Sequence, residues 1–464
     1  MARASGVVSF WYKRRVRPVQ YKYDVTSLQE RVVSRTAAVL AQECGADTLR
    51  ALGLEVIGPL FLGFTQWLLQ QVKADKPDLL LFLARDGAFL REIFERLLRN
   101  ESGPSRAYFM SSRRALNFPT YTSLDDRAVL TLCANNASLP VSEFFSRINI
   151  DIAQYPHELA SLNLTADTRV HSEPVRDRLK ALFRLIEPVV LEKARAERPL
   201  LVQFLAQTGV LSASHVALVD VGWGGTMQDA IAAIVADEGH ETRFTGYYVG
   251  TDPRIKKLAK RAGKAYGYLT DAGKPDADQI LINFGYWLIE IASSADHGTT
   301  LGYRLSDNGA IDAVLHDFDA ATPNAQTATA LQHAALELVD RWAMIFEGAG
   351  PTLSRHGALA RLKRFVEQPT LSEARTFGDL IHVAGLGTTV EETAIARPLS
   401  LAETLRRPRA MLTAYREAHW PVAFLQRVFH SNRIARGILS IRTLWRRSRA
   451  IVRDGMLTRE ADMP

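Results

Sequence analysis

An acidic residue followed by a glycine-rich segment is the strongest chemical signal in the chain. The apolar run 216–219 ends in Asp220, and Val-Gly-Trp-Gly-Gly-Thr occupies 221–226. Three glycines in four positions let the backbone turn sharply and approach a ligand closely. A helix expected over 227–236 would add unpaired N–H groups and the positive end of its dipole. This pattern is typical of a phosphate cradle beside an acid that faces a sugar hydroxyl or a metal; the alternative is a tight turn whose glycines only pack.

A second acidic residue has a similar setting. Residues 78–84 form a tightly bounded apolar run, and Arg85, Asp86 and Gly87 follow it. Arginine and aspartate are rarely buried unless they are paired, so one interpretation is an ion pair that caps the next helix. The other interpretation is a loop that faces the same crevice as the glycine-rich segment.

Two further groups could contact a ligand. Arg113 and Arg114 follow the short run 106–110, and guanidinium groups suit bidentate phosphate binding, although a solvated surface is the alternative. Glu290 lies among apolar residues and precedes His297. A carboxylate in apolar surroundings can act as a general base; the alternative is a helical glutamate paired with a basic neighbour, with His297 as a capping residue.

These residues need a scaffold that brings the ends of strands together. Strand-like apolar runs occupy 78–84, 106–110, 215–220 and 244–250, and helical periodicity occupies 28–41, 54–72, 89–98, 122–207 and 227–236. Strands that alternate with helices predict an α/β fold with a doubly wound, mainly parallel sheet. Because ligands of open α/β sheets bind at the carboxyl ends of the strands, Asp86 and Asp220 are expected at one edge.

Four regions are expected along the 464 residues. A basic arm and a helix occupy 1–45, and the α/β domain occupies 46–305, with a helical insertion over about 122–207. The pattern is helical from about 325 onward, so 306–425 is expected to be a helical region. A basic amphipathic tail covers 426–464.

Composition narrows the class of protein. A hydrophobic fraction of 47% with 23% charged residues excludes a disordered chain and a polytopic membrane protein. Cys44 and Cys133 are the only cysteines, which excludes a disulfide scaffold and indicates a reducing compartment. Neither a signal peptide nor an uninterrupted apolar run of about 18 residues is found, so we expect a cytoplasmic protein without a transmembrane helix.

The formal net charge is +7, with basic clusters near both ends of the sequence. Residues 427–453 contain eight arginines and no acid, interleaved with Trp445 and aliphatic side chains. A basic amphipathic helix with Trp is typical of a membrane-surface element. We therefore expect peripheral contact with the inner face of the cytoplasmic membrane, with a solvated helix as the alternative. No nucleic-acid-binding motif accompanies the charge, so no nucleic-acid partner is expected.

The segment 219–226 (VDVGWGGT) resembles the phosphoribosyl-pyrophosphate motif of type I phosphoribosyltransferases, in which an acidic strand end precedes a Thr/Gly-rich loop that binds the 5-phosphate. That motif has two adjacent acids, whereas Val221 follows Asp220 here. Residues 83–87 (LARDG) lie where such enzymes place the pyrophosphate loop. More broadly, about residues 50–305 resemble phosphoribosyltransferase-like proteins of bacterial capsule and O-antigen clusters, often labelled predicted hydrolases of the haloacid-dehalogenase type. The segments that carry this likeness are Gly58-Pro59, 82–87, Ser112-Arg113, 220–228, Tyr247-Tyr248 and 290–298.

The resemblance implies an enzyme that transfers ribofuranose 5-phosphate from phosphoribosyl pyrophosphate to a hydroxyl of a lipid-linked glycan acceptor in surface polysaccharide biosynthesis. It implies Mg²⁺ as cofactor, held by Asp86 and Asp220, and a separate phosphatase as partner. Asp86, Asp220 and Glu290 would be catalytic, with Glu290 as the first candidate for the base and Asp86 as the second. The residues expected to bind substrate are Arg85, Gly87, Ser112, Arg113, Arg114, Gly222, Trp223, Gly224, Gly225, Thr226, Gln228 and His297.

Three other functions stay open. A phosphohydrolase of the dehalogenase type needs two aspartates two residues apart at a strand end, and neither Asp86 nor Asp220 has such a partner. A sugar kinase of the actin-like type has a similar Asp-x-Gly-Gly-Thr loop, but between two strands of a hairpin, whereas a helix is expected here. A non-catalytic scaffold docked on the membrane through its basic ends would need none of the loop residues.

Overall fold

The computed structural model describes residues 27–44, 47–99, 103–133, 139–272, 278–384, 391–399 and 406–431, with residues 403, 433, 434 and 437. The basic arm before residue 27 and most of the arginine-rich tail lie outside the described residues. The chain divides into two compact units, one formed by 1–359 with 383–392 and the other by 360–382 with 393–464. The boundary expected at 305/306 falls inside a β-hairpin of the first unit.

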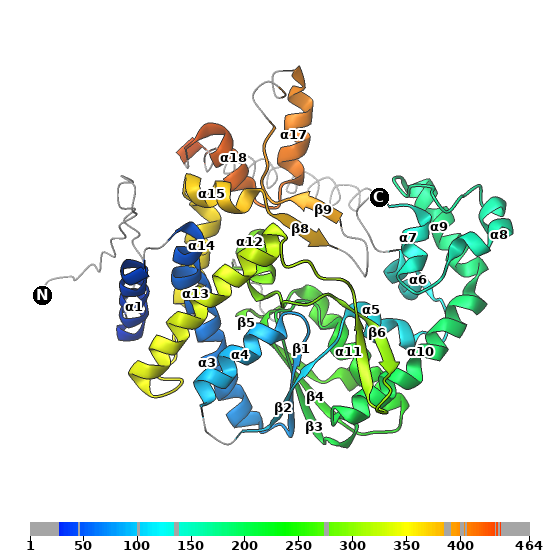
Figure 1. Ribbon diagram of the computed structural model, residues 1–464, viewed down its shortest axis with the longest axis horizontal. Helices are drawn as coiled ribbons and strands as arrows, with labels where there is room; N and C mark the ends of the chain where they lie inside the picture. The colour runs from blue at the N-terminus through cyan, green and yellow to red at the C-terminus, as the bar shows by residue number, and fades with distance from the viewer. Residues whose placement is uncertain are drawn as a thin grey trace, which may run out of the picture. The chain divides into compact units, whose positions relative to one another are not determined.

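A five-stranded parallel sheet forms the core of the first unit (Figure 1). Its strand order is β2-β1-β3-β4-β5, and each neighbouring pair is parallel. The strands are β1 (Leu79–Leu83), β2 (Ser105–Phe109), β3 (His215–Asp220), β4 (Arg243–Gly250) and β5 (Lys264–Thr270). The predicted α/β class with a parallel sheet is confirmed, and β5 is an edge strand that the apolar pattern did not predict.

Helices cover both faces of this sheet, which explains why every residue of β1 and β3 is buried. On one face, the ring of Phe82 in β1 meets Phe94 edge to face, with 5.5 Å between centroids. On the other face, Leu81 belongs to an apolar cluster with Leu205. The helices that supply these layers are α3 (Gly58–Asp75) and α4 (Gly87–Leu98) on the first face, and α10 (Glu187–Gln207) and α11 (Thr226–Asp237) on the second.

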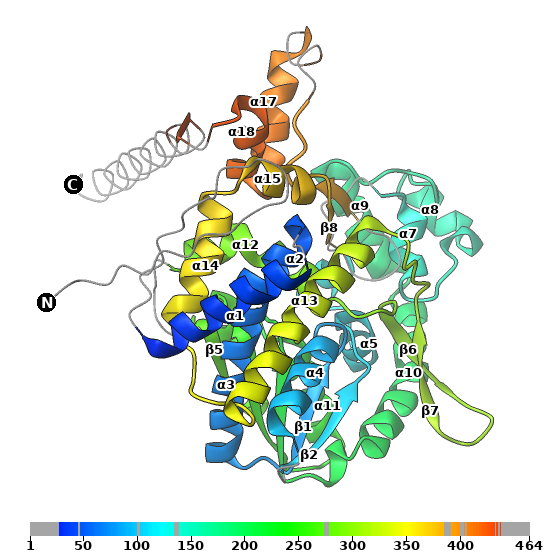
Figure 2. The same cartoon turned by 60° about the vertical axis from the view of Figure 1, so that its left-hand side comes forward.

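Further helices extend the layer around α3. Figure 2 shows α13 running beside α1 and α3. These and the other elements of this part are α1 (Leu28–Cys44), α2 (Thr48–Leu52), the π-helical turn Gly53–Ile57, α5 (Arg113–Asn117), α12 (Asp278–Ser293) and α13 (Pro323–Phe346). Short 3₁₀ turns lie at Phe118–Thr120, Ile152–Gln154, Val210–Ser212, Pro253–Lys257 and Lys260–Ala262.

The segment Thr48–Asp75 is the one described helical segment long and apolar enough to cross a membrane. In its most apolar window, 83% of the residues are buried inside the protein, which is the pattern of a core helix. Gly58 lets α3 approach its neighbours closely, because a Cβ there would lie 2.7 Å from Leu338 Cδ2 on α13.

The helical insertion between β2 and β3 has an apolar core of its own. Its helices are α6 (Asp126–Leu132), α7 (Val141–Ser146), α8 (Pro156–Ser161) and α9 (Glu173–Leu185), and the first part of α10 joins them. The rings of Phe145 and Phe183 stack at 4.1 Å within this core. Leu201 and Phe204, later in α10, belong instead to the apolar cluster beneath the sheet. One helix therefore links the insertion to the α/β core.

Four further strands follow the main sheet in the described part of the chain, and three of them lie in the region 306–425 that was expected to be helical. The hairpin of β6 (Thr300–Leu305) and β7 (Ile311–Leu315) follows α12, and β8 (Ile381–Ala384) and β9 (Glu391–Ala394) form a second two-stranded sheet. The expectation of a purely helical region after about residue 325 is therefore wrong at β8 and β9. These strands are short and contain polar residues, so the apolar pattern did not reveal them.

The second unit is small and mainly helical. Its core includes Trp420, whose indole stacks on Phe365 at 4.5 Å and donates a hydrogen bond from Nε1 to the Val366 carbonyl at 2.8 Å. Its helices are α15 (Leu371–Gly378), α17 (Pro408–Glu417) and α18 (Pro421–Phe429), and α14 (Arg355–Glu367) spans the boundary between the units.

Candidate functional site

The two loops singled out by their acids meet at the point where the strand order reverses. β1 pairs with β2 on one side and with β3 on the other, and Phe82 is opposite Val219 in the register. The carboxyl ends of β1 and β3 therefore lie next to each other. In open α/β sheets this reversal leaves a crevice in which ligands bind. Asp86 and Asp220 stand at its two sides.

The loop after β1 presents Asp86 without using its carboxylate as a helix cap. Asp86 occupies the cap position of α4, yet its side chain makes no capping hydrogen bond. The next residue must be glycine, because a Cβ on Gly87 would lie 2.6 Å from the Phe82 carbonyl carbon. The peptide bond between Ala84 and Arg85 is cis, as is the one between Gly222 and Trp223 in the other loop.

The loop after β3 can form only with glycine at two of its positions. Gly222 has φ +150°, and a Cβ there would lie 2.4 Å from the Gly250 carbonyl oxygen at the end of β4. Gly225 has φ +68°, where a side chain is strained, and a Cβ would also meet Ile255. Thr226 then begins α11 and is exposed. The backbone of this loop is thus held close to β4 while the start of α11 faces solvent.

The charges of three carboxylates, Asp86, Asp220 and Glu290, act on one another beside these loops. Asp220 is 4% exposed, and its Oδ1 accepts a hydrogen bond from the Val221 N–H at 2.8 Å. Burial and the charge of Glu290 raise the pKa of Asp86 to about 7, although the nearby Arg85 lowers it. Burial and the charge of Asp86 raise the pKa of Asp220 well above its usual value. Burial and mutual repulsion disfavour the ionised forms of these carboxyls, and a bound cation would stabilise those forms.

Glu290 is positioned by the tryptophan of the glycine-rich loop. Trp223 Nε1–H donates to Glu290 Oε1 at 3.0 Å, and the indole packs against Gly250 of β4. Trp287 and Ile291, on the same helix as Glu290, are buried, so α12 presents an apolar face to the core and its glutamate to the crevice. The sequence alone indicates both Trp223 and Glu290 as site residues, but not the contact between them.

Three arginines supply positive charge. The charges of Arg85 and Arg113 act on Asp86, and that of Arg113 also acts on Asp220. The sequence did not single out Arg254, whose guanidinium would lie 3.3 Å from a Cβ on Gly224 and which pairs with Asp252. The sequence feature that could have indicated Arg254 is Asp-Pro-Arg at 252–254, shortly after an apolar strand. The site thus combines anionic and cationic groups across one crevice.

Tyr108, in β2, is a second residue of the site that no pattern in the sequence indicates. Its hydroxyl lies 2.6 Å from His297 Nε2 and 3.3 Å from the Arg85 carbonyl oxygen. His297 Nδ1 is 2.8 Å from the Gly298 carbonyl, which only accepts, so in the neutral ring Nε2 accepts from Tyr108. Burial and the charge of Asp86 raise the pKa of Tyr108, which keeps the hydroxyl protonated. The predicted residue His297 therefore reaches the site through Tyr108.

Three residues expected to bind substrate have structural roles instead. Arg114 is buried and forms a bidentate pair with Glu197, and its Nε donates to the Arg147 carbonyl at 2.7 Å. Ser112 caps α5 and donates to the Thr300 carbonyl at 2.6 Å. Gln228 is fully buried; it donates to the carbonyls of Ala262 and Lys264 and accepts from Tyr248. These placements correct the expectation, because the polar groups are already satisfied within the fold.

The residue next to Ser112 is a better candidate for a ligand contact. Ser111 follows β2 directly, and its side chain is 1% exposed. Its hydroxyl has no hydrogen-bond partner among the described residues. A buried hydroxyl without a partner is unfavourable, so a bound ligand or a water molecule would satisfy it. Nothing in the sequence distinguished Ser111 from Ser112.

Within the described part of the chain, no three His, Cys, Asp or Glu side chains are grouped so that they could hold a metal ion by themselves. Mg²⁺ is often bound by one or two carboxylates together with substrate phosphates and water. Asp86 and Asp220, with their raised pKa values, fit that kind of site.

No protein-family model matches the chain, and no curated protein is significantly similar to it in sequence.

Proposed function

We propose that this protein is a phosphoribosyltransferase that uses phosphoribosyl pyrophosphate to add ribofuranose 5-phosphate to a glycan hydroxyl in bacterial surface polysaccharide biosynthesis. The observation that carries the proposal is that the adjacent strands β1 and β3 lead into Asp86 and Asp220 beside the glycine-rich start of α11. The charge of Glu290 acts on both aspartates. A doubly wound fold of the type I phosphoribosyltransferase kind is part of the same proposal. The strand order β2-β1-β3-β4-β5 supports it, because this order is common among doubly wound sheets.

The donor would lie across the crevice between β1 and β3. Backbone N–H groups of residues 222–226, with the Thr226 hydroxyl, would bind the 5-phosphate at the positive end of the α11 dipole. Asp220 would accept hydrogen bonds from ribose hydroxyls. Arg85 and Arg113, whose charges already act on Asp86, would bind the diphosphate.

Asp86 and Asp220 are the residues that would hold Mg²⁺ together with the donor phosphates. When bound, the ion would offset negative charge on the diphosphate. The protein's contribution is to hold two buried carboxylates at adjacent strand ends, where a bound cation would stabilise their ionised forms.

The transfer needs a base for the acceptor hydroxyl. In the proposed step, the acceptor oxygen forms a bond to C1 of the ribose, and the bond from C1 to the diphosphate oxygen breaks. The leaving diphosphate takes the electron pair, and Glu290 takes the hydroxyl proton. Trp223 holds the Glu290 carboxylate through its 3.0 Å hydrogen bond, so the base keeps one orientation. The positive charges of Arg85 and Arg113 stabilise the diphosphate as it leaves.

The acceptor in this proposal is a lipid-linked glycan at the inner face of the cytoplasmic membrane. The arginine-rich sequence after residue 431 would hold the enzyme there. Because the product still carries a 5-phosphate, and neither Asp86 nor Asp220 has the second aspartate of the dehalogenase nucleophile motif, a separate phosphatase would remove it.

Titration calorimetry of the full chain with phosphoribosyl pyrophosphate, with and without Mg²⁺, tests the proposal. We expect Mg²⁺-dependent binding, weakened at least about 100-fold in Asp220→Ala, because charged and hydrogen-bonded contacts are lost together. Asp307→Asn, at an exposed turn of the β6–β7 hairpin, is the matched control and should bind like the wild type. Absence of binding in both conditions, or phosphate release from simple phosphomonoesters in its place, would contradict the transferase and favour the phosphohydrolase.

A further inference from the structure

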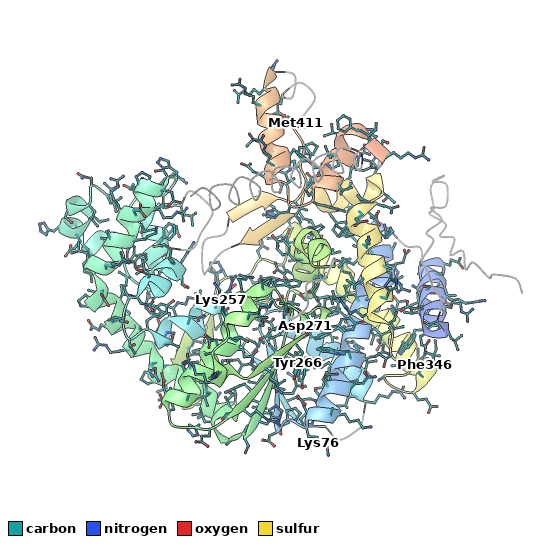
Figure 3. The ribbon with its side chains drawn as sticks, turned by 180° about the vertical axis from the view of Figure 1, so that it is seen from behind. Lys76, Lys257, Tyr266, Asp271, Phe346 and Met411 are labelled. Carbon is teal, nitrogen blue, oxygen red and sulfur yellow. The ribbon has the colours of Figure 1, made fainter. Side chains whose placement is uncertain are left out.

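A pocket outside the carboxylate cluster lies along the free edge of β5. Its volume is about 350 Å³, within the range of small-molecule sites. Figure 3 shows Asp271 at the carboxyl edge of the sheet, opposite Lys76 at the other edge. The lining residues are Trp67, Gly267, Tyr268, Asp271, Thr352, Leu353 and Arg355. They come from α3, from β5 and the residue that follows it, from the segment between α13 and α14, and from the first residue of α14.

The walls of this pocket are fixed to one another. Gln66 of α3 is 2% exposed; its Nε2 donates to the carbonyls of Ala349 and Pro351, and its Oε1 accepts from the Leu353 N–H at 2.8 Å. Arg355 Nε donates to the Leu269 carbonyl in β5 at 2.7 Å. The segment 349–355 is therefore tied both to α3 and to β5. A pocket that is already formed loses little entropy when it binds a ligand.

The aromatic side chains that line the pocket, Trp67 and Tyr268, are also held in place by their neighbours. The rings of Trp67 and Tyr268 lie 5.8 Å apart between centroids, and Trp67 meets Tyr247 edge to face. Gly63 permits this arrangement, because a Cβ there would lie 2.5 Å from the Tyr268 hydroxyl. Trp67 remains half-buried, so part of the indole surface faces the pocket.

The polar groups of the pocket carry no net charge. Asp271 and Arg355 have opposite charges, and Thr352 adds a hydroxyl that already accepts from Gln70 Nε2 at 2.6 Å. An anionic ligand would meet the carboxylate, and a cationic ligand would meet the guanidinium. A neutral ligand with several hydroxyls could donate to Asp271 and accept from Arg355 while its C–H face packs on Trp67. A sugar ring has this combination of an apolar face and a hydroxyl-rich rim.

The pocket and the carboxylate cluster lie near the same edge of the sheet. Asp220 ends β3, Gly250 ends β4 opposite Thr270, and Asp271 follows Thr270 at the end of β5. Two strand spacings, about 10 Å, separate the ends of β3 and β5. The Trp223 indole lies between them against Gly250. An oligosaccharide could therefore extend from the reacting carbon toward the pocket.

We infer that the pocket formed by Trp67, Tyr268, Asp271 and Arg355 binds a neutral sugar ring of the glycan acceptor and so selects the acceptor. The assignment of this sugar to an acceptor rests on the proposed transferase function. Sugar binding itself depends only on the pocket.

Saturation-transfer NMR on the full chain tests the inference, with the methyl glycosides of glucose, galactose, mannose and N-acetylglucosamine as probes. We expect transfer to at least one glycoside in the wild type. Asp271→Asn should weaken its affinity roughly tenfold, the effect of one hydrogen bond to a charged group. Trp67→Leu should reduce transfer to the ring C–H protons. Asp307→Asn removes the same charge at a distant exposed turn and should change nothing.

Transfer to none of the glycosides in the wild type, or undiminished transfer in Asp271→Asn, overturns the inference. Calorimetry with phosphoribosyl pyrophosphate on the same samples separates the two proposals. Donor binding without glycoside binding removes the sugar pocket and leaves the transferase. Glycoside binding without donor binding keeps the pocket and removes the transferase. Asp271→Asn should bind the donor like the wild type, which also shows that this variant is folded.

Discussion

The ionised carboxylate of Asp86 is unfavourable in the folded protein. Burial and the neighbouring charge of Glu290 raise its pKa to about 7, from an ordinary value near 3.8. A carboxyl whose folded-state pKa is raised contributes most to stability when it is protonated. That contribution is lost as the pH rises from about 4 through about 7, because the unfolded chain ionises first. At pH 8, ionised Asp86 therefore destabilises the ligand-free protein.

We predict that Asp86→Asn increases the free energy of unfolding at pH 8 by roughly 1–2 kcal/mol; this is less than the full pKa shift implies, because the side chain is partly exposed. The gain should shrink as the pH falls toward 5. Urea unfolding of wild type and variant at both pH values, without ligand, measures this difference in the free energy of unfolding. Asp307→Asn should show no such dependence. Equal stability of Asp86→Asn and wild type at pH 8 would mean that Asp86 is not electrostatically strained.

At the scale of elements, the loop between β3 and α11 needs a position that has no side chain, because the backbone of β4 lies too close for a Cβ. Gly222 lies so close to the last residue of β4 that a Cβ on it would be 2.4 Å from the Gly250 carbonyl oxygen. The same contact keeps Trp223 against Gly250 and hence holds Glu290. Loop shape and the orientation of the base are therefore linked.

We predict that Gly222→Ala weakens binding of phosphoribosyl pyrophosphate at least about tenfold and lowers stability by more than 2 kcal/mol, roughly the upper cost of a left-handed residue alone. Gly239→Ala is the matched control, because Gly239 has φ +82° with no atom within 4 Å of the added Cβ. It should lose roughly 1–2 kcal/mol of stability and keep its donor affinity. Similar donor affinities in the two variants would show that the close contact with Gly250 has no role in binding. Calorimetry and urea unfolding provide the two readouts.

Which elements the sequence could predict depends on their burial. β1 and β3 are buried at every residue, so short apolar runs marked them, and the rule for carboxyl ends then brought Asp86 and Asp220 together. β5 has four residues that are not buried, and its mixed composition contains no apolar run that would indicate a strand.

The sequence also could not show which of the adjacent residues Arg113 and Arg114 acts on the site. Successive residues of a helix point about 100° apart, so only one of two adjacent arginines can face the site. The Tyr108–His297 contact joins residues 189 positions apart, and no local pattern reveals such a pair.

At the scale of the whole molecule, charge is distributed unevenly along the chain. The net charge is +7, and eight arginines without an acid occupy 427–453. In the last described part of the chain, Phe429 and Ile434 are 46% and 49% exposed. Exposed apolar groups beside arginines favour an anionic membrane surface, where each basic residue contributes about 1 kcal/mol.

We predict that the full chain sediments with phosphatidylglycerol vesicles but not with phosphatidylcholine vesicles, and that about 1 M salt releases it because screening shortens electrostatic attraction to a few ångströms. A chain ending at residue 431 should stay in the supernatant and still bind phosphoribosyl pyrophosphate, since the proposed donor site lies in the first unit. Lysine in place of the arginines from 433 to 453 preserves charge and should preserve sedimentation, whereas glutamine should abolish it. If the glutamine chain sediments like the wild type, the tail is not an electrostatic anchor. If the shortened chain loses donor binding as well, the tail belongs to the catalytic machinery instead.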